Sequence, residues 1–279
     1  MLHIRVMNLD DLPLGCRLKE TAGWNQCHAD WQRLLALEPA GCFVAEWDGQ
    51  PVGTACVTRF DTIAWISMVL VDAAHRGRGI GTQLMRHALA WLDQRGTRTV
   101  RLDATALGRP VYEKLGFLGQ YDVARWEGKA VGGELRPEIT FAAESHLEAI
   151  SVLDHEATGT PRGPLLARLF TERPRGMRVA VAQGRVTGFS GVRPGGRAWQ
   201  VGPVVALDAS SGSALLDAAF FDHQGQSVFL DVPLPNRPAM QRAEARGLRV
   251  QRQFLRMARG RPLADRPEQM WASFGPEKG

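Results

Sequence analysis

Apolar and polar positions alternate with two different periods along the first half of the chain. Residues 42–47 and 52–58 have the short period typical of strands, and Asp48-Gly49 between them predicts a hairpin turn. Residues 63–71 are nearly all apolar, which favours a more deeply buried strand. Apolar residues then recur at helical spacing over residues 80–92. This pattern predicts strands and helices mixed within one fold.

The second half repeats these landmarks more faintly and in the same order. Val71-Asp72, before the long helix, matches Leu207-Asp208 before another helical stretch, and Gly116-Phe117 matches Gly247-Leu248. Conserved order favours an internal duplication, although two unrelated α/β halves that share common hairpin chemistry stay open as an alternative. We expect domains at residues 1–132 and 138–260, a linker at 132–137, and a mobile tail over 261–279.

Composition narrows the class of protein. The chain has 279 residues, of which 44% are hydrophobic and 23% charged, as in globular proteins with one large or two ordinary domains. No apolar run is long enough to cross a bilayer and no secretory signal opens the chain, so we expect a cytoplasmic protein without a membrane partner. The four cysteines predict free thiols, and the net charge of +5 rests on scattered arginines, which argues against a nucleic-acid partner.

The most informative segment is the glycine-rich turn between the buried strand and the long helix. Three glycines let the backbone approach a ligand with no Cβ in the way, and the helix N-terminus offers free N–H groups. Two arginines add charge-assisted donors, so the turn predicts a site for a diphosphate. A basic turn that only caps a helix is the alternative. The residues concerned are Arg76, Gly77, Arg78, Gly79, Ile80, Gly81 and Thr82.

Two common phosphate-binding motifs do not fit this turn. A P-loop requires a lysine after the glycine, and none follows Gly79. A dinucleotide-binding motif requires a third glycine, but the register that starts at Gly77 ends on Thr82. The remaining pattern, Arg76-x-x-Gly79-x-Gly81, resembles the acetyl-coenzyme A motif of the GNAT family of N-acetyltransferases.

A second stretch supports the same resemblance. Pro110-Val111-Tyr112-Glu113-Lys114-Leu115-Gly116-Phe117 is similar to the second GNAT signature, a tyrosine on a short helix that ends in Lys-Leu-Gly-Phe. The resemblance implies an α/β (α+β) protein with two tandem GNAT-like domains, each a mixed, mostly antiparallel twisted sheet flanked by helices. Residues 207–213 lack the arginines and most of the glycines of the turn, so we expect a catalytic N-terminal domain and a degenerate C-terminal one.

The resemblance also implies roles for individual residues, with acetyl-coenzyme A as cosubstrate and no metal. Val69, Leu70 and Val71 would meet the pantetheine arm, and the amides of residues 76–82 would hold the diphosphate. Tyr112 would protonate the departing thiolate, although a packed aromatic side chain is the alternative. Thr105 stands where many family members carry an asparagine near the cofactor.

The acceptor side is less defined. Trp24 and Asn25, after the first helix, are candidates for substrate binding, and a tryptophan that pins its loop to the core is the alternative. No general base is assigned, because each candidate also fits a surface or capping role. These candidates are Glu20, His28, Asp30, Glu46 and Asp61.

The expected reaction is direct attack of an amine of a small molecule or peptide on the acetyl group in a ternary complex. The alternative is a non-catalytic acetyl-coenzyme A sensor. The oligomeric state stays open between monomer and homodimer.

Overall fold

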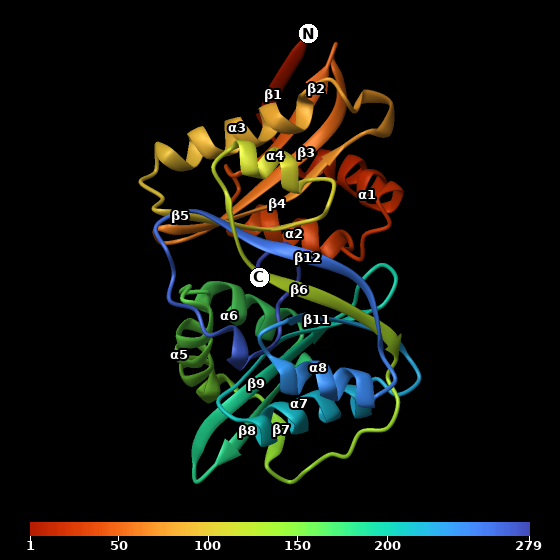
Figure 1. Ribbon diagram of the computed structural model, residues 1–279, viewed down its shortest axis with the longest axis vertical. Helices are drawn as coiled ribbons and strands as arrows, with labels where there is room; N and C mark the ends of the chain where they lie inside the picture. The colour runs from red at the N-terminus through yellow and green to blue at the C-terminus, as the bar shows by residue number, and fades with distance from the viewer. The chain divides into compact units, whose positions relative to one another are not determined.

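A computed structural model describes residues 1–279, which form two compact units (Figure 1). Unit 1 contains residues 1–118, 257–262 and Lys278, and unit 2 contains residues 119–256, 263–277 and Gly279. The expected division into contiguous stretches differs from these units, because each unit takes in a segment distant in sequence.

Unit 1 is a sheet with helices on both faces. Its strands follow the order β1-β2-β3-β4-β5, antiparallel except for the parallel pair β4 and β5, and the end of β12 adjoins β5. The elements are β1 (Leu2–Val6), α1 (Leu12–Thr21), α2 (His28–Leu37), β2 (Cys42–Trp47), β3 (Gln50–Phe60), β4 (Ile63–Val71), α3 (Ile80–Asp93), β5 (Thr99–Ala104) and α4 (Arg109–Lys114).

Local chemistry explains these elements. Asp48 and Gly49 both have positive φ, 50° and 78°, as a tight hairpin turn between β2 and β3 requires, which confirms the predicted turn. Alternate residues of β2 then face opposite layers: Val44 packs in the cluster under α1 and α2, while Phe43 contacts His87 of α3 edge to face at 4.6 Å. Burial on both faces accounts for the apolar run of the adjoining strands.

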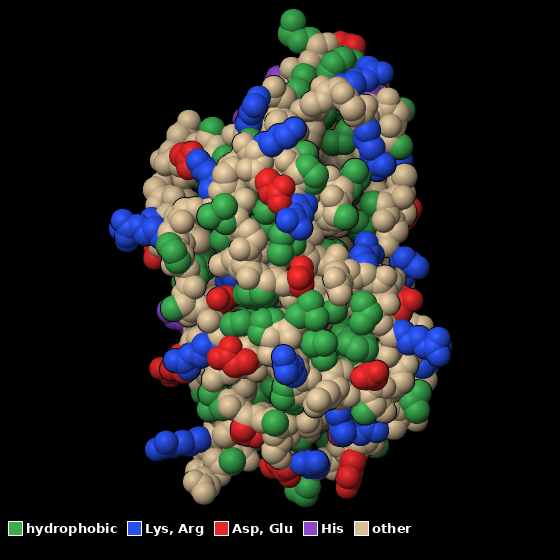
Figure 2. All heavy atoms as spheres, in the orientation of Figure 1, with side chains coloured by type: hydrophobic (Ala, Val, Ile, Leu, Met, Phe, Trp, Pro, Cys, Tyr) green, Lys and Arg blue, Asp and Glu red, His purple; other side chains and the backbone are tan.

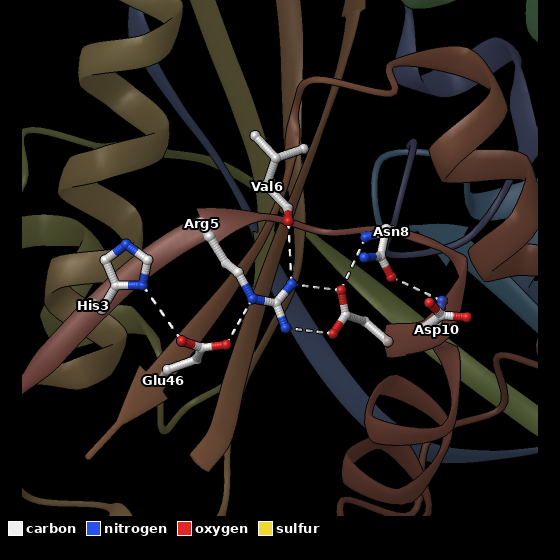
Figure 3. A network of polar contacts seen from close by, with 7 residues as sticks. His3, Arg5, Val6, Asn8, Asp10 and Glu46 are labelled. Carbon is white, nitrogen blue, oxygen red and sulfur yellow. Dashed lines mark hydrogen bonds and ion pairs between the residues drawn. The ribbon is translucent and has the colours of Figure 1, made fainter. Parts of the chain in front are cut away.

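An ion-pair network fixes the entry into α1 (Figure 3). Arg5 of β1 donates two hydrogen bonds of 2.7 Å to the buried Asp11 and a third of 2.6 Å to Glu46. Asp11 also accepts from the amide of Asn8 at 2.9 Å. Hydrogen bonds from Arg5 lower the pKa of Asp11 and of Glu46. Both carboxylates therefore stay ionised and paired with Arg5 at neutral pH.

Unit 2 repeats the arrangement. Its strand order is β12-β6-β11-β10-β9-β8-β7, with β13 paired to β10, and β10 and β11 form the parallel pair. The elements are β6 (Leu118–Lys129), β7 (Ile139–Phe141), α5 (Leu147–Thr158), α6 (Gly163–Glu172), β8 (Met177–Ala182), β9 (Arg185–Arg193), β10 (Trp199–Ala206), α7 (Ala209–Asp222), β11 (Ser227–Pro233), α8 (Arg237–Ala245), β12 (Arg249–Gly260) and β13 (Met270–Ala272).

The expectation of a mobile tail over residues 261–279 is wrong for its last ten residues. Residues 270–272 form β13, and Trp271 is 2% exposed against α7. Gly212 of α7 leaves the space for this indole, since a Cβ there would overlap the ring. Glu277 forms an ion pair with Arg193, and Arg162 donates to the carbonyl of Gly279. The sequence of this segment is polar and contains proline, so it did not indicate these buried contacts.

Asp154 and Arg162 form a buried ion pair, with Arg162 donating at 2.7 and 3.0 Å. All four cysteines are free thiols, as expected. None of the helices is both long and apolar enough to cross a membrane.

Candidate active site

The parallel strands β4 and β5 separate part of the way along. They pair at Ile63↔Thr99, Ala64↔Val100 and Trp65↔Arg101, and no pairing continues beyond. The amide of Asp72 donates to Val52 of β3 at 2.8 Å, so by strand alternation the backbone groups of Val71 and Val69 point away from β3, into the gap. Those of Leu70 face β3 instead, where Leu70 pairs with Thr54.

A bulge in β4 precedes the gap. Met68 has a φ of 53°, unusual for a residue other than glycine, and the register with β3 shifts between Thr54 and Cys56. The buried Thr54 hydroxyl donates to the Met68 carbonyl at 2.8 Å and satisfies it. The bulge therefore redirects β4 where it leaves β5.

The glycine-rich turn follows β4 and opens α3. Gly77 and Gly79 have φ of 78° and 77°, which side chains with a Cβ rarely adopt, and nothing lies within 4 Å of a Cβ built on either. Gly79 is the N-cap of α3, and it offers no side chain to the first amides of the helix. The turn is thus exposed backbone, open at both glycines, and it leaves the N-terminus of α3 without a side-chain cap and accessible to an anion.

The charged groups around the turn are held by neighbours. Asp72 accepts from Ala74 at 3.1 Å and from Arg17 of α1 at 2.5 Å, and the bond from Arg17 is the main cause of its lowered pKa. Arg76 donates through Nε to the Val71 carbonyl at 3.1 Å, and Arg78 lies over the Trp47 ring at 5.3 Å. Arg17 therefore offsets the carboxylate nearest the turn, while Arg76 and Arg78 remain exposed beside it.

Tyr112 lies on α4, the short helix after β5. Its ring is half-buried beside Phe117, with centroids 6.1 Å apart, and its hydroxyl makes no hydrogen bond within the protein. Desolvation raises its pKa to about 12, so the hydroxyl keeps its proton at neutral pH. Gly108 makes room for the ring, since a Cβ there would lie 2.8 Å from Cε2.

Thr105 has a local role at the turn into α4. Its carbonyl accepts from the amides of Gly108 and Arg109 at 3.0 Å, and its hydroxyl lies 3.3 Å from the Gly108 amide. Thr105 thus shapes the loop that carries Tyr112, and its contact with a cofactor stays a prediction.

Trp24 and Asn25 lie in the loop between α1 and α2. Trp24 packs against the hydrophobic cluster that also contains Met68 and Leu70 of β4, and its amide binds the Lys19 carbonyl at 2.9 Å. Asn25 is 3% exposed. The structure gives Trp24 the pinning role, and the proposed acceptor contacts stay predictions.

The candidate bases have structural partners or turn positions. Glu46 binds Arg5, and the buried Asp30 binds Arg33 and the Cys27 amide. Glu20 and His28 are exposed, and Asp61 occupies the β3–β4 turn with a φ of 56°. None of these is marked out as a base by its contacts.

Sequence reasoning missed Met68, Thr54 and Gly108. Methionine carries no signature of positive φ, and the roles of Thr54 and Gly108 depend on contacts made only in the folded unit. Of the three, Gly108 alone offered a sequence signal. It immediately precedes the helix that carries Tyr112, and a residue without a Cβ leaves space for an aromatic ring.

In unit 2 the corresponding gap is filled. Strands β10 and β11 pair at residues 199–201 and 228–230, and β13 then lies antiparallel to β10, with Val204 opposite Ala272. The Ser273 amide donates to the backbone carbonyl of Asp231 in β11 at 2.8 Å. Asp208 caps α7 directly by accepting from the Ser211 amide at 2.8 Å. Unit 2 therefore lacks both the open gap and the open helix start.

Cationic side chains do not form a stripe on the face shown in Figure 2. Blue and red side chains are interspersed there over both units. This distribution agrees with the scattered arginines of the sequence.

Comparisons with known proteins match both halves. Residues 7–117 match the family model described as "Acetyltransferase (GNAT) family", and residues 150–272 match one described as "Acetyltransferase (GNAT) domain". A solved putative acetyltransferase from Pyrococcus horikoshii is similar in fold, with a TM-score of 0.86 at 23% identity, over 100% of this chain and 96% of that one.

Two curated relatives give the same result. The chain is 33% identical to an uncharacterized N-acetyltransferase, MJ1207, of Methanocaldococcus jannaschii over 37% of this chain, and it spans about half (49%) of that relative. It is 22% identical to the uncharacterized N-acetyltransferase YitH of Bacillus subtilis over 78% of this chain and 77% of the relative.

Proposed function

The chain belongs to the GNAT acetyltransferase family and is an acyltransferase, and from this premise we propose that unit 1 transfers an acetyl group from acetyl-coenzyme A to an amine of a small molecule or peptide. Unit 2 provides no second site for the cofactor in this proposal. The observation that carries it is the open gap between β4 and β5, which leads to a glycine turn with space at Gly77 and Gly79.

The residues present fit the cofactor by size and charge. A diphosphate needs several donors and no nearby uncompensated carboxylate. The amides of residues 76–82 and the side chains of Arg76 and Arg78 would supply the donors, and Arg17 offsets Asp72. The backbone groups of Val69 and Val71 would hydrogen-bond the pantetheine arm along the edge of β4.

Acetyl-coenzyme A supplies an activated thioester, and the residues of unit 1 position it and manage charge. The Val69 amide would donate to the acetyl oxygen as negative charge develops on it. The Tyr112 hydroxyl would donate its proton to the leaving sulfur, which its raised pKa allows because the group is neutral below about pH 12. The amine must be neutral to attack, and we assign no side chain to its deprotonation.

Thiol release tests this proposal. The full chain is incubated with acetyl-coenzyme A and a panel of amino acids, polyamines, antibiotic amines and peptides with free N-termini, and free thiol is measured against an enzyme-free control. We expect release that depends on one class of amine. Tight binding of acetyl-coenzyme A with no release on any amine would favour the sensor instead. Absence of binding by calorimetry would remove both.

A further inference from the structure

Two arginines of unit 2 share one aromatic ring. Arg252 of β12 lies over the ring of Phe254 with its guanidinium carbon 5.5 Å from the centroid, and Arg125 of β6 lies over the same ring at 5.4 Å. Phe254 is 4% exposed, whereas Arg252 is half-buried and reachable from solvent. Both guanidinium groups thus pack against one aromatic ring of the core.

The two guanidinium groups differ in their partners. Arg125 donates two hydrogen bonds of 2.7 Å to Asp231, which also accepts from Gln200 at 3.1 Å. Arg252 makes no ion pair: its Nε donates to the neutral side chain of Gln251 at 3.0 Å. Arg125 is therefore paired directly with a carboxylate, and Arg252 is not.

Neither neighbouring carboxylate is hydrogen-bonded to the Arg252 guanidinium. Glu127 accepts from the neutral side chain of Gln251 at 2.6 Å, and Asp231 is bound to Arg125. Desolvation lowers the pKa of Arg252 most and repulsion from Arg125 lowers it next, while Asp231 raises it, with smaller effects of Arg197 and Glu127 in opposite directions. A guanidinium group nevertheless stays protonated at neutral pH. Arg252 is thus a half-buried cation with no carboxylate hydrogen-bonded to it, and a bound anion would stabilise the folded chain.

We propose that Arg252 binds the carboxylate group of a small molecule, with Phe254 as the apolar floor of the site. A carboxylate matches the guanidinium in shape, since both are planar and can form two parallel hydrogen bonds. It also matches in charge, because one guanidinium group carries one positive charge. A phosphate dianion would exceed that charge.

Binding is tested on the full chain with propionate as the probe. Thermal unfolding is followed with increasing sodium propionate against sodium chloride at equal ionic strength, in wild type, Arg252→Gln and Arg249→Gln. Arg249 is an exposed arginine on the same strand and serves as the matched control. We expect propionate to raise the Tm of wild type and Arg249→Gln, and to leave Arg252→Gln at its chloride value.

Three results would overturn the proposal. They are a propionate effect that is absent from wild type, one that persists in Arg252→Gln, and a larger Arg252-dependent effect of phosphate than of propionate. Without ligand, removal of a half-buried charge that has no direct ion pair should leave the Tm unchanged or raise it by about 2–4 °C. A fall of several degrees would instead assign Arg252 a packing role.

Kinetic measurements distinguish a carboxylate on the acceptor from one on a separate acid. Acceptor pairs that differ only in a carboxylate, an amino acid and its decarboxylated amine, are compared in wild type and Arg252→Gln. If the group belongs to the acceptor, the variant raises KM for the amino acid alone, by about tenfold or more. If it belongs to a separate acid, both acceptors respond alike, and propionate still binds. Failure of acetyl transfer leaves the thermal measurement intact.

Discussion

The two units place the same elements around the same gap and leave it in opposite states. In unit 1 the separation of β4 from β5 stays open beyond Trp65, whereas in unit 2 the separation of β10 from β11 is occupied by β13 and the residues that follow. The backbone of Ser273 bonds across to Asp231, as a ligand in the gap would. The gap that is open in unit 1 is filled by the chain itself in unit 2.

The N-termini of α3 and α7 also differ: the first is open and the second is capped. Residues 73–79 separate Asp72 from α3 in unit 1, so the carboxylate caps the short turn and stays off the helix N-terminus. In unit 2, α7 begins at Ala209, immediately after Asp208, and this carboxylate occupies the N-terminus itself. Counting back from the matched glycines, Tyr112 corresponds to the buried Ala243. The two units therefore share a fold but differ at the gap and at the helix start, so function must be argued from the site.

The largest effect is expected from Gly79→Asp, which places a carboxylate at the N-cap of α3, as Asp208 does at α7 in unit 2. The carboxylate would repel a diphosphate, and the φ of 77° would strain the side chain. We expect coenzyme A affinity to fall by about a hundredfold or more, measured by calorimetry. Gly184→Asp, at a φ of 74° in the β8–β9 turn, matches the strain away from the turn and should bind normally. Equal binding by both variants would locate the diphosphate elsewhere.

Trp271→Ala tests whether the filled gap of unit 2 is structural. The side chain is 2% exposed, and its loss should cost about 3–5 kcal/mol of unfolding free energy, measured by denaturant titration. Phe221→Ala, 49% exposed on α7, should change stability by about 0.5 kcal/mol or less. Coenzyme A should still bind once per chain, and a second equivalent in the variant would break the comparison.

Tyr112→Phe removes a hydroxyl that unit 2 has no counterpart for. We expect kcat to fall by about ten- to a thousandfold with cofactor affinity retained, because only the proton donor is lost. The raised pKa of about 12 means that wild type should show no alkaline loss of kcat from this group below about pH 10. Tyr121→Phe, at the other tyrosine, is the control. An unchanged kcat with chemistry limiting would remove the acid role of Tyr112.

The smallest effect is expected from Arg17→Gln, which leaves Asp72 charged and unpaired near the turn. The pair is partly exposed, so coenzyme A affinity should fall by about two- to fivefold at low salt and recover at high salt. The double variant with Asp72→Asn should regain affinity, since no carboxylate remains. A loss that the double variant retains would assign Arg17 direct contact with the cofactor.

Local chemistry made unit 1 predictable from sequence. The Asp48-Gly49 turn, the apolar run of β4 and the glycines before α3 each depend on neighbours in the chain, and each lies where it was expected. The repeated landmarks around Leu207-Asp208 similarly indicated the second GNAT-like domain.

Features that depend on long-range contacts could not be predicted from the sequence. Strand β13 is three residues long and pairs with β10 some 65 residues earlier, so no local pattern marks it. The bulge at Met68 and its bond from Thr54 likewise exist only once β3 and β4 are aligned. The mobile-tail error and the missed residues share this cause.

The position of β12 has a consequence for how the protein is made. The end of this late strand and the two residues after it, 257–262, belong to unit 1, where the Arg261 amide binds the Arg98 carbonyl and Thr99 donates to the Arg261 carbonyl. A ribosome that has delivered residues 1–118 has therefore not yet supplied the last piece of the sheet. The N-terminal unit completes this part of its sheet only after residues 257–262 have been synthesised.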